Sequence, residues 1–214
     1  VDAAHRADGI GKRSMKLHWS PTSPFVRKVM IAVHEVGVAD QLELAETFPQ
    51  SVIEDVSQDN PLGMIPALVT DEGEALYDSS VIIAWLNHRY GGSLLPAPGP
   101  EAWAVYRRHA LGHGLIDTTN ARFHEHRRPT ELQWSQQDAK LTKRIALAVD
   151  GLDREAEALA GPFTVAQIAA GVALSYLDLR FPDEDWRTSR PALADWHAAI
   201  SERPSFAATA PPSA

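Results

Sequence analysis

The first half of the chain alternates between two spacings of apolar residues. Short runs in which apolar and polar positions alternate predict strands, and runs in which apolar residues recur every three to four positions predict helices. The predicted strands cover 16–19, 42–48, 67–70 and 74–77, and the predicted helices cover 23–36, 51–59 and 78–90. The order βαβα followed by ββα is typical of a mixed, four-stranded α/β unit.

The second half of the chain contains only helical patterns. A segment rich in glycine and proline, 91–100, precedes it and predicts a domain boundary. Thr164 stands three residues before Gln167, which is the spacing of a capping box that begins a helix. We expect helices at about 101–128, 131–159, 164 onward and 192–203. We divide the chain into an N-terminal extension (1–14), an α/β domain (15–92), a linker (93–100) and an all-helical domain (101–214).

Composition and charge exclude several classes of protein. The formal net charge is −8, and no long basic run is present, which argues against nucleic acid as a partner. There is no cysteine, so disulfides, thiolate metal ligands and a cysteine nucleophile are excluded. No run approaches the roughly 20 apolar residues of a membrane span, and no secretory signal is recognisable, so we expect a cytoplasmic protein without a membrane partner. Residues 1–14 are interpreted as an extension or cloning remnant ahead of a natural start at Met15.

Candidate chemistry begins in the sequence SPTSPFVRK, residues 20–28, where the first strand ends and a helix begins. Serine is a favoured N-cap residue and proline is favoured at the first helical position, so Ser23 and Pro24 mark the helix start. Free N–H groups and the positive end of the helix dipole favour an anion there, such as a thiolate. The alternative interpretation is that Ser23 only caps the helix.

Two further segments place ligand-binding groups at comparable positions. Ile65–Pro66 precedes a predicted strand and is a candidate cis peptide bond, with the main chain of Ile65 available to pair with an extended ligand. Asp78 and Ser79 begin the next helix, where a carboxylate suits an ammonium group and a hydroxyl suits a carboxylate. Each pair alone is also consistent with an ordinary turn or cap. Together with Ser23, they predict a cradle for an anionic peptide.

Three motifs in this order, SPTSPFVRKV, NPLGMIPALV and LYDSSVIIAWL, resemble the thioredoxin-like domain of the glutathione S-transferase superfamily. The later segments HGLIDTTNARFHEHRRPTELQ, GPFTVAQIAAGVALSYLDLRFP and RPALADWHAAISERPSF are similar to the C-terminal domain of its bacterial, YibF-like branch. The resemblance covers Met15 to the C-terminus. It implies an α/β thioredoxin-like domain followed by an all-α helical-bundle domain, with glutathione as co-substrate and no metal. It also implies a small electrophilic substrate, a homodimer and a role in detoxification.

The resemblance implies a role for the serine at the first helix start. Ser23 matches the position at which serine-type members place the hydroxyl that hydrogen-bonds the glutathione thiolate. Thr22 and Ser20 are the reserves for this catalytic role. An alcohol is too weak an acid to ionise here, so the hydroxyl is expected to donate a hydrogen bond rather than to act as a nucleophile or base.

The remaining glutathione contacts follow from the same resemblance. Ile65, before Pro66, matches the residue whose main chain pairs with the cysteinyl part of glutathione. Asp78 and Ser79 match the residues that hold its γ-glutamyl end. The implied glutathione-binding residues are Ser23, Phe25, Met64, Ile65, Pro66, Asp78 and Ser79.

One position departs from the pattern of the superfamily. Members often have lysine where this chain has Met64. A cationic contact to a glutathione carboxylate is therefore absent unless Lys28, Arg27 or His34 supplies it.

The site for the electrophile is expected between the two domains, along the helix predicted at 101–128. The residues His109, His113, Asn120 and Phe123 are candidates to line it and to favour polar substrates. His109, His113 and Asp117 share one helix face, which in principle suits a metal. No further ligand motif completes a metal site, so we interpret this face as ordinary polar surface.

Four other residues of the same helix carry structural expectations. Gly112 and Gly114 are costly in a helix interior, which predicts close packing of another chain segment. Trp103 and Tyr106 are expected in the core or in an interface, because large apolar side chains of helices are usually placed there.

Three functions remain open at this point. The leading hypothesis is an enzyme that transfers glutathione to small electrophiles. The second is a glutathione-binding or ligand-holding protein with little turnover, which the departure at Met64 favours. The third is a scaffold that uses the same fold for protein contacts. Disulfide-reducing chemistry is disfavoured because the chain has no cysteine.

Overall fold

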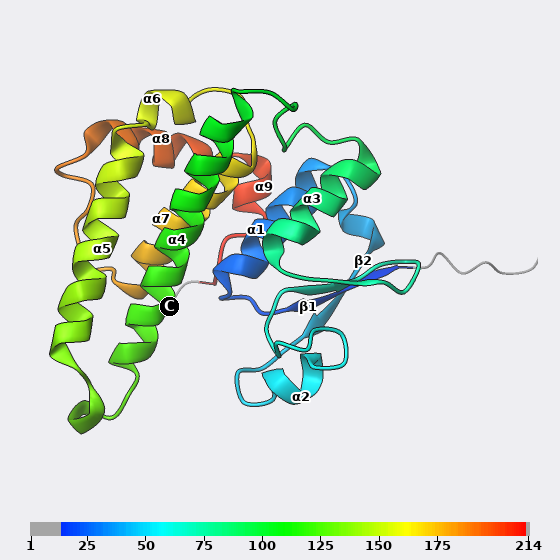
Figure 1. The fold of residues 1–214 in the computed structure, drawn as a ribbon, viewed down its shortest axis with the longest axis horizontal. Helices are drawn as coiled ribbons and strands as arrows, with labels where there is room; N and C mark the ends of the chain where they lie inside the picture. The colour runs from blue at the N-terminus through cyan, green and yellow to red at the C-terminus, as the bar shows by residue number, and fades with distance from the viewer. Residues whose placement is uncertain (1–13, 213–214) are drawn as a thin grey trace, which may run out of the picture.

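The computed structural model describes residues 14–212 and shows an α/β half followed by a helical half (Figure 1). The interpretation of residues 1–14 as an extension lies, except for Ser14, outside the described residues. Among the helices between Ser14 and Pro212, none combines the length and the apolar composition needed to cross a membrane.

The α/β half is built on a four-stranded sheet in the order β2-β1-β3-β4. The first strand, β1 (Met15–Trp19), is parallel to β2 (Leu42–Glu46) and antiparallel to β3 (Ala67–Val69). The short edge strand β4 (Ala75–Leu76) pairs antiparallel with β3. This is the βαβ unit and hairpin that the periodicity predicts, with β2, β3 and β4 shorter than expected.

Three helices accompany the sheet. The first, α1 (Pro24–Glu35), and the third, α3 (Ser79–Tyr90), pack together over one face, and the short α2 (Val52–Val56) lies on the other side (Figure 1). A 3₁₀ turn, η1 (Ala39–Gln41), leads into β2. The apolar positions of these elements meet in a shared core that includes the fully buried residues Leu17, Val29, Leu68 and Ile82. The sheet and α1 thereby fix where β1 ends and α1 begins.

The helical half surrounds one almost completely buried helix. That helix, α7 (Val165–Arg180), packs against α4 (Ala102–His126) and α1, and α5 (Ser135–Asp153) packs alongside α4 (Figure 1). The predicted capping box is confirmed: the Thr164 N–H donates to Gln167 Oε1 at 3.0 Å, and Thr164 Oγ1 accepts from the α7 main chain. The remaining short elements are η2 (Thr130–Leu132), α6 (Ala156–Leu159), α8 (Pro191–Ser201) and α9 (Pro204–Ala207).

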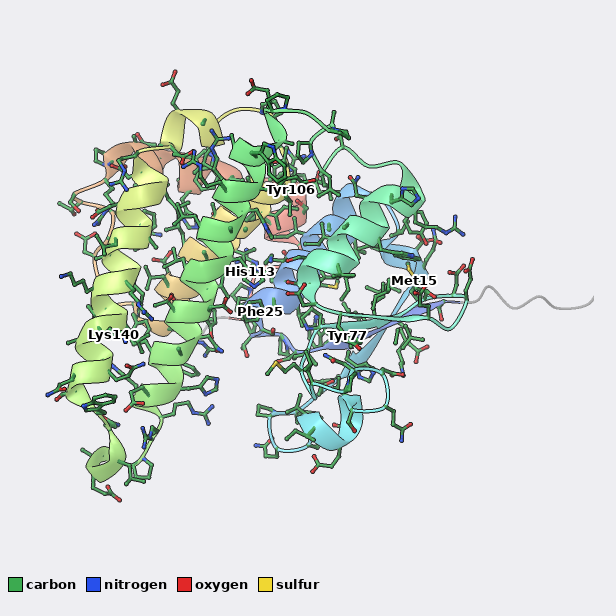
Figure 2. The ribbon with its side chains drawn as sticks, viewed as in Figure 1. Met15, Phe25, Tyr77, Tyr106, His113 and Lys140 are labelled. Carbon is green, nitrogen blue, oxygen red and sulfur yellow. The ribbon has the colours of Figure 1, made fainter. Side chains whose placement is uncertain are left out.

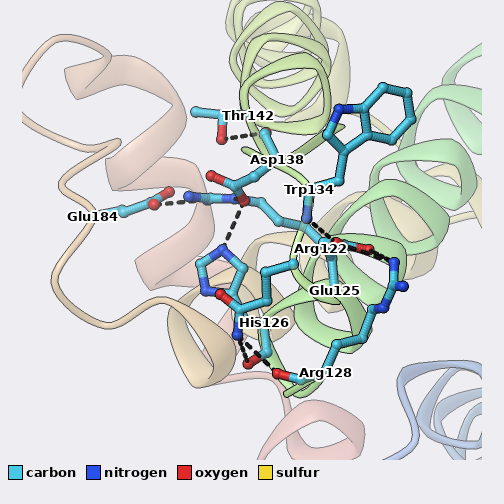
Figure 3. Close-up of polar contacts among 9 residues, drawn as sticks. Arg122, Glu125, His126, Arg128, Trp134, Asp138, Thr142 and Glu184 are labelled. Carbon is cyan, nitrogen blue, oxygen red and sulfur yellow. Dashed lines mark hydrogen bonds and ion pairs between the residues drawn. The ribbon is translucent and has the colours of Figure 1, made fainter. Parts of the chain in front are cut away.

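The single helix expected at 131–159 is wrong, because the structure divides this stretch into η2, α5 and α6. At the first division, the Trp134 N–H donates to a carboxylate oxygen of Glu125 at 2.6 Å, and Glu125 also binds Arg128 (Figure 3). A side chain of α4 therefore binds the main chain at the start of α5 and turns the chain there. At the second division, Glu155 pairs with Arg107 and Arg108 of α4.

The two glycines of α4 have different surroundings. A Cβ at Gly112 would lie 2.7 Å from main-chain atoms of Ala169 and Ala170, so α4 and α7 approach each other closely only because this residue has no side chain. A Cβ at Gly114 would meet nothing within 4 Å. The prediction of close packing is thus confirmed for Gly112 and wrong for Gly114.

The two aromatic residues near the start of α4 lie on the surface. Trp103 is 74% exposed and Tyr106 is 39% exposed, and their rings contact each other with centroids 6.3 Å apart. The core position is therefore wrong for both residues. Their alternative placement in an interface stays a prediction.

Candidate functional site

A cavity of about 440 Å³ lies where the α/β half meets the helical half. From the α/β half it is lined by the turn before α1, the start of α1 and the loop before β3. From the helical half it is lined by residues of α4 and α7 and by Arg127, directly after α4. The lining contains no Asp or Glu among the described residues; it consists of Ser20, Thr22, Ser23, Pro24, Phe25, Pro49, Val52, Gly63, Met64, Ile65, Asn120, Phe123, His124, Arg127, Tyr176 and Arg180.

Ser23 is the N-cap of α1 and lines this cavity. Its Oγ accepts a hydrogen bond from the Val26 N–H at 3.3 Å, and Pro24 occupies the first turn of the helix. Accepting that bond uses a lone pair of Oγ, and within residues 14–212 no acceptor is recorded for the hydroxyl proton. Ser23 can therefore cap the helix and still donate a hydrogen bond into the cavity.

The other two hydroxyl residues of the turn, Ser20 and Thr22, also line the cavity. Ser20 contributes to the turn through its main chain, because its carbonyl oxygen accepts from the Ser23 N–H at 3.3 Å. Neither side chain caps α1, so the arrangement differs from that of Ser23. Their reserve role stays a prediction.

The loop before β3 presents main-chain groups to the same cavity. The Ile65–Pro66 peptide bond is cis, as predicted. In the described part of the chain, neither the N–H nor the C=O of Ile65 makes a main-chain hydrogen bond. The buried Asn60 organises the loop: its side chain donates to the Met64 carbonyl at 2.8 Å and accepts from the Leu62 N–H at 3.0 Å. The Met64 side chain is 62% exposed and supplies no positive charge.

Asp78 and Ser79 begin α3, as predicted, and lie outside the lining of the cavity. Asp78 is the N-cap, and its Oδ1 accepts from the Ser80 N–H at 2.9 Å. Ser79 is buried, and its Oγ accepts from Lys28 Nζ at 3.2 Å. Because Lys28 lies on α1, one turn after the cap at Ser23, this bond connects the start of α3 with the helix that lines the cavity.

Lys28 is a fully buried amine between the two halves of the molecule. Besides Ser79, its Nζ contacts His113 Nδ1 on α4 at 2.9 Å. Burial lowers the pKa of Lys28 to about 8, and the carboxylates of Asp78 and Asp117 oppose that change. The pKa of His113 is also lowered, by burial and then by the positive charge of Lys28. Both lowered pKa values fit a neutral His113 whose Nδ1 accepts a hydrogen bond from the Lys28 ammonium.

Of the three cations considered as substitutes for the lysine absent at Met64, only Lys28 reaches a predicted glutathione-binding residue. The guanidinium of Arg27 donates instead to the carbonyl of Phe206 at 3.3 Å. His34 lies in the last turn of α1, at the other end from Ser23. A positive charge is therefore present next to Ser79, whereas the Met64 side chain itself supplies none.

The four candidates for the electrophile site separate into two pairs. Asn120 and Phe123 line the cavity, whereas His109 and His113 are not among its lining residues. The His113 ring instead packs against the ring of Phe25, with centroids 5.4 Å apart (Figure 2). Burial lowers the pKa of His109 to about 4, with the charge of Lys28 acting in the same direction, and no partner for its Nε2 is recorded between Ser14 and Pro212.

Sequence reasoning missed four residues of the helical wall, which are His124, Arg127, Tyr176 and Arg180. The Tyr176 hydroxyl donates to Asn120 Oδ1 at 3.0 Å, which links α7 to α4 beside the cavity. Arg180 stacks on Phe123, 4.0 Å from its ring centroid, and lies 5.1 Å from that of Tyr176. The sequence gives no local signal for these positions, because they meet only through the packing of α4 on α7. Within the described residues, no group of three His, Asp or Glu side chains is arranged to hold a metal ion.

Comparison with known proteins identifies the class to which this fold and site belong. Residues 17–94 match the family model of the glutathione S-transferase N-terminal domain, and residues 133–199 match that of the C-terminal domain. The chain belongs to the glutathione S-transferase family.

Among its relatives is the uncharacterized GST-like protein YibF of Escherichia coli K12. The two are 32% identical over 204 residues, which cover 94% of this chain and all of YibF. A solved glutathione transferase family member from Pseudomonas fluorescens Pf-5 with bound glutathione superposes with a TM-score of 0.89 at 39% identity, covering 93% of this chain and 100% of that one. A second structure from Pseudomonas fluorescens Pf-5, with bound S-(propanoic acid)-glutathione, has a TM-score of 0.85 at 38% identity and the same coverage. A glutathione S-transferase from Methylobacillus flagellatus KT with glutathione bound has a TM-score of 0.85 at 36% identity, again with that coverage.

Proposed function

We propose that this protein is a glutathione transferase that joins the sulfur of glutathione to small electrophiles, with Ser23 stabilising the thiolate. The observation that carries the proposal is the position of the Ser23 hydroxyl, which caps α1 through its oxygen while its proton is available to the cavity. Relatives of similar sequence and fold hold glutathione or a glutathione conjugate, and this supports glutathione as the ligand here.

In this proposal, Ser23 acts on the ionisation of the bound thiol. A thiol with a pKa near 8.5 is only a few per cent ionised at pH 7, so a lower pKa raises the fraction that reacts. The Ser23 O–H donates a hydrogen bond to the thiolate, and the start of α1 adds the positive end of its dipole. The thiol proton leaves to water. Ser23 itself neither attacks nor takes up a proton.

The transfer step follows from the thiolate. Its sulfur attacks an electrophilic carbon and forms a carbon–sulfur bond, and the leaving group departs with the bonding electron pair. In this scheme, the main chain of Ile65 pairs with the cysteinyl part of glutathione. Asp78 receives the γ-glutamyl ammonium, and Ser79 receives the γ-glutamyl carboxylate. Phe25, Met64 and Pro66 contribute contacts, and Lys28 places a positive charge next to Ser79.

The experiment compares Ser23→Ala with wild type, using glutathione and 1-chloro-2,4-dinitrobenzene. We expect kcat to fall about a hundredfold, the typical effect of removing one hydrogen-bond donor from a developing or stabilised anion. Glutathione affinity, measured by calorimetry, should change about threefold or less. The acid limb of the pH profile of kcat/KM should move upward by about one to two pH units, because the bound thiol loses its stabilising donor.

Two variants control for the loss of the helix cap. Ser23→Thr keeps both the cap and the hydroxyl donor and should recover most of the rate. Thr22→Ala changes a neighbouring cavity residue and should leave the pH profile in place. The assignment to Ser23 would be wrong if Ser23→Ala kept wild-type turnover while Thr22→Ala or Ser20→Ala lost it.

The competing function is a glutathione-binding or ligand-holding protein with little turnover. The exposed Met64, in place of a lysine that would bind a carboxylate, is the observation that favours it. Calorimetric binding of glutathione without conjugation of any tested electrophile would support this alternative. If millimolar glutathione gave no heat in calorimetry and no shift of the melting temperature, only the hypothesis of a scaffold for protein contacts would remain.

We also infer a homodimer. The exposed, contacting aromatic rings of Trp103 and Tyr106 support this, because exposed apolar clusters often mark protein interfaces. Light scattering on wild type and on the double variant Trp103→Ser, Tyr106→Ser should show a dimer and a monomer, respectively. A monomeric wild type would contradict the inference.

A further inference from the structure

Two arginines on the helical side of the cavity have no anionic partner in the described structure. Most arginines of the helical half are paired, as in Arg128 with Glu125 and Arg187 with Asp178. For Arg127 and Arg180, no ion pair with any residue of 14–212 is recorded, although the chain as a whole carries a net charge of −8. Both line the cavity, whose walls contain no Asp or Glu among residues 14–212.

The guanidinium of Arg180 is held in place by two aromatic side chains: it stacks on Phe123 and hydrogen-bonds to the Tyr176 hydroxyl. It lies 4.0 Å from the centroid of Phe123 and 5.1 Å from that of Tyr176, and its Nε is buried without a hydrogen-bond partner within residues 14–212. Stacking of this kind fixes the plane of a guanidinium and leaves available those N–H donors that do not bind Tyr176. A buried donor without a partner costs free energy, and a ligand oxygen would remove that cost.

Arg127 adds a second positive charge at the same ring. Its guanidinium lies 5.7 Å from the centroid of Phe123, so Phe123 contacts two arginines. Two like charges on one ring repel each other unless an anion lies near both. The end of α4 that carries Arg127 is fixed by the buried Arg122, which bonds to Asp138 at 2.9 Å and to Glu184 at 2.6 Å (Figure 3).

We propose that Arg180, assisted by Arg127, forms a subsite for the carboxylate of an anionic electrophile. The inference rests on the proposed function, because it concerns the second substrate of the same cavity. Phe123 and Tyr176 would contact the body of that substrate, which points to an aromatic or unsaturated acid. A guanidinium binds a carboxylate through two parallel hydrogen bonds, which neutral or cationic electrophiles cannot match. Glutathione itself would bind on the opposite, α/β side, along Ser23 and Ile65.

The test uses glutathione conjugates, so that it does not depend on turnover. The probes are S-(4-carboxybenzyl)glutathione, its amide S-(4-carbamoylbenzyl)glutathione, and S-benzylglutathione, each titrated calorimetrically at low salt. We expect wild type to bind the carboxylate about tenfold more tightly than the amide, as one charge-assisted pair provides. This preference should decrease as salt is added.

The variants locate the preference. Arg180→Gln should abolish the tenfold difference while leaving the affinities for glutathione and S-benzylglutathione within about twofold of wild type. Arg127→Gln should reduce the difference by about threefold, and Arg180→Lys should retain part of it. Arg128→Gln is the matched control, because Arg128 follows Arg127, is exposed and pairs with Glu125 rather than lining the cavity. It should behave as wild type.

A kinetic comparison extends the test to the reaction. With 4-chloro-3,5-dinitrobenzoate, the thiolate forms a bond to the ring carbon that carries chlorine, and chloride leaves with its electron pair. The corresponding amide reacts in the same way and lacks the charge. After the uncatalysed rates are subtracted, the KM of Arg180→Gln for the benzoate should be about tenfold higher than that of wild type. Its KM for the amide should equal that of wild type.

Three outcomes would overturn the inference. If wild type bound the carboxylate conjugate and the amide conjugate equally well, and also bound S-benzylglutathione, the subsite would be excluded and the proposed function would stand. If Arg180→Gln lost as much affinity for glutathione as for the carboxylate conjugate, the arginine would bind a carboxylate of glutathione instead. Failure of glutathione and of all three conjugates to bind would remove the proposed function, and the subsite with it.

Discussion

The two walls of the cavity are built in different ways. The α/β wall presents short side chains and main-chain groups at the ends of elements, such as the cap at Ser23 and the loop at Ile65. The helical wall presents long side chains from two helices, such as Asn120 on α4 and Arg180 on α7. Local sequence determines the first wall, and the packing of α4 on α7 determines the second. Substitutions in the α/β wall should therefore change glutathione binding, and substitutions in the helical wall should change stability and the choice of electrophile.

The largest expected effect is on the helical wall. Gly112→Ala places a Cβ against main-chain atoms of Ala169 and Ala170, which cannot move as a flexible side chain would. We expect the free energy of unfolding, measured in urea, to fall by about 3 kcal/mol. The glutathione dissociation constant of the folded variant should stay within about twofold of wild type, because the α/β wall is unchanged.

The matched control is Gly114→Ala, two residues along the same helix, where a Cβ meets no other atom. It should raise the free energy of unfolding by about 0.5–1 kcal/mol, because alanine is favoured over glycine in a helix. Equal effects of the two substitutions would contradict the view that close approach at Gly112 sets the position of α4.

The next effect is on the α/β wall. Asp78→Asn keeps an N-cap residue of equal quality and removes the negative charge. We expect unchanged stability and a glutathione dissociation constant raised about tenfold, because the γ-glutamyl ammonium loses a charged partner. Asp78→Ala should lose the cap as well and reduce the free energy of unfolding by about 1 kcal/mol. Unchanged glutathione affinity in Asp78→Asn would exclude Asp78 from the ligand site.

Acid should weaken the helical half through His197, whose Nε2 lies 3.0 Å from Ser175 Oγ. Burial lowers the pKa of His197 to about 4, and the carboxylate of Asp178 only partly opposes this. Below pH 6.5 the unfolded chain therefore binds more protons than the folded one, so stability decreases between pH 6.5 and about 4. At pH 5 the free energy of unfolding should be lower by about 2 kcal/mol from this group.

The control for this titration is an exposed histidine. Replacing His197 by Phe should flatten the decrease in urea-unfolding free energy between pH 6.5 and 5, whereas His88→Gln should leave it as in wild type. A decrease of the same steepness in the His197 variant would assign the acid sensitivity to other groups. His109, whose pKa is also lowered to about 4, should contribute in the same direction.

The smallest expected effect on glutathione binding concerns Lys28, which connects the two halves of the molecule. Its folded pKa of about 8 lies below the model-peptide value of 10.5, so the unfolded chain holds more protons between these pH values. Wild-type stability should accordingly rise from pH 8 to 10.5, and Lys28→Met should remove that rise. We also expect Lys28→Met to weaken glutathione binding about fivefold, through loss of the charge beside Ser79.

Lys16→Met is the matched control, since Lys16 pairs with Asp59 on the sheet, away from the cavity lining. It should keep both the wild-type glutathione affinity and the alkaline rise in stability. Unaltered binding in Lys28→Met would restrict Lys28 to a structural role between α1 and α4.

The sequence predicted the α/β wall because its features are local. Ser23 with Pro24, Ile65 with Pro66, and Asp78 with Ser79 are short patterns whose conformations follow from caps and turns within a few residues. The predicted fold is correct for the same reason, as each strand and helix has its own period.

The helical wall was predicted less completely because its residues meet only in three dimensions. Asn120 and Phe123 lie where the helix pattern placed them, but Tyr176 and Arg180 come from a helix some 50 residues further along the chain. The division of the expected 131–159 helix also depends on a distant carboxylate, Glu125. Neither the periodicity nor the composition contains that information.

The helix α1 makes contacts with both halves along its whole length, and this affects how the protein opens. Ser23 begins it, Lys28 in its middle binds His113 of α4, and Glu35 at its end binds Arg203 and Ser205. Separating α1 from its neighbours therefore breaks contacts in both halves at once. Hydrogen exchange at the buried amides of α1 should therefore require global rather than local unfolding, and the Ser23 hydroxyl lies at the start of this segment.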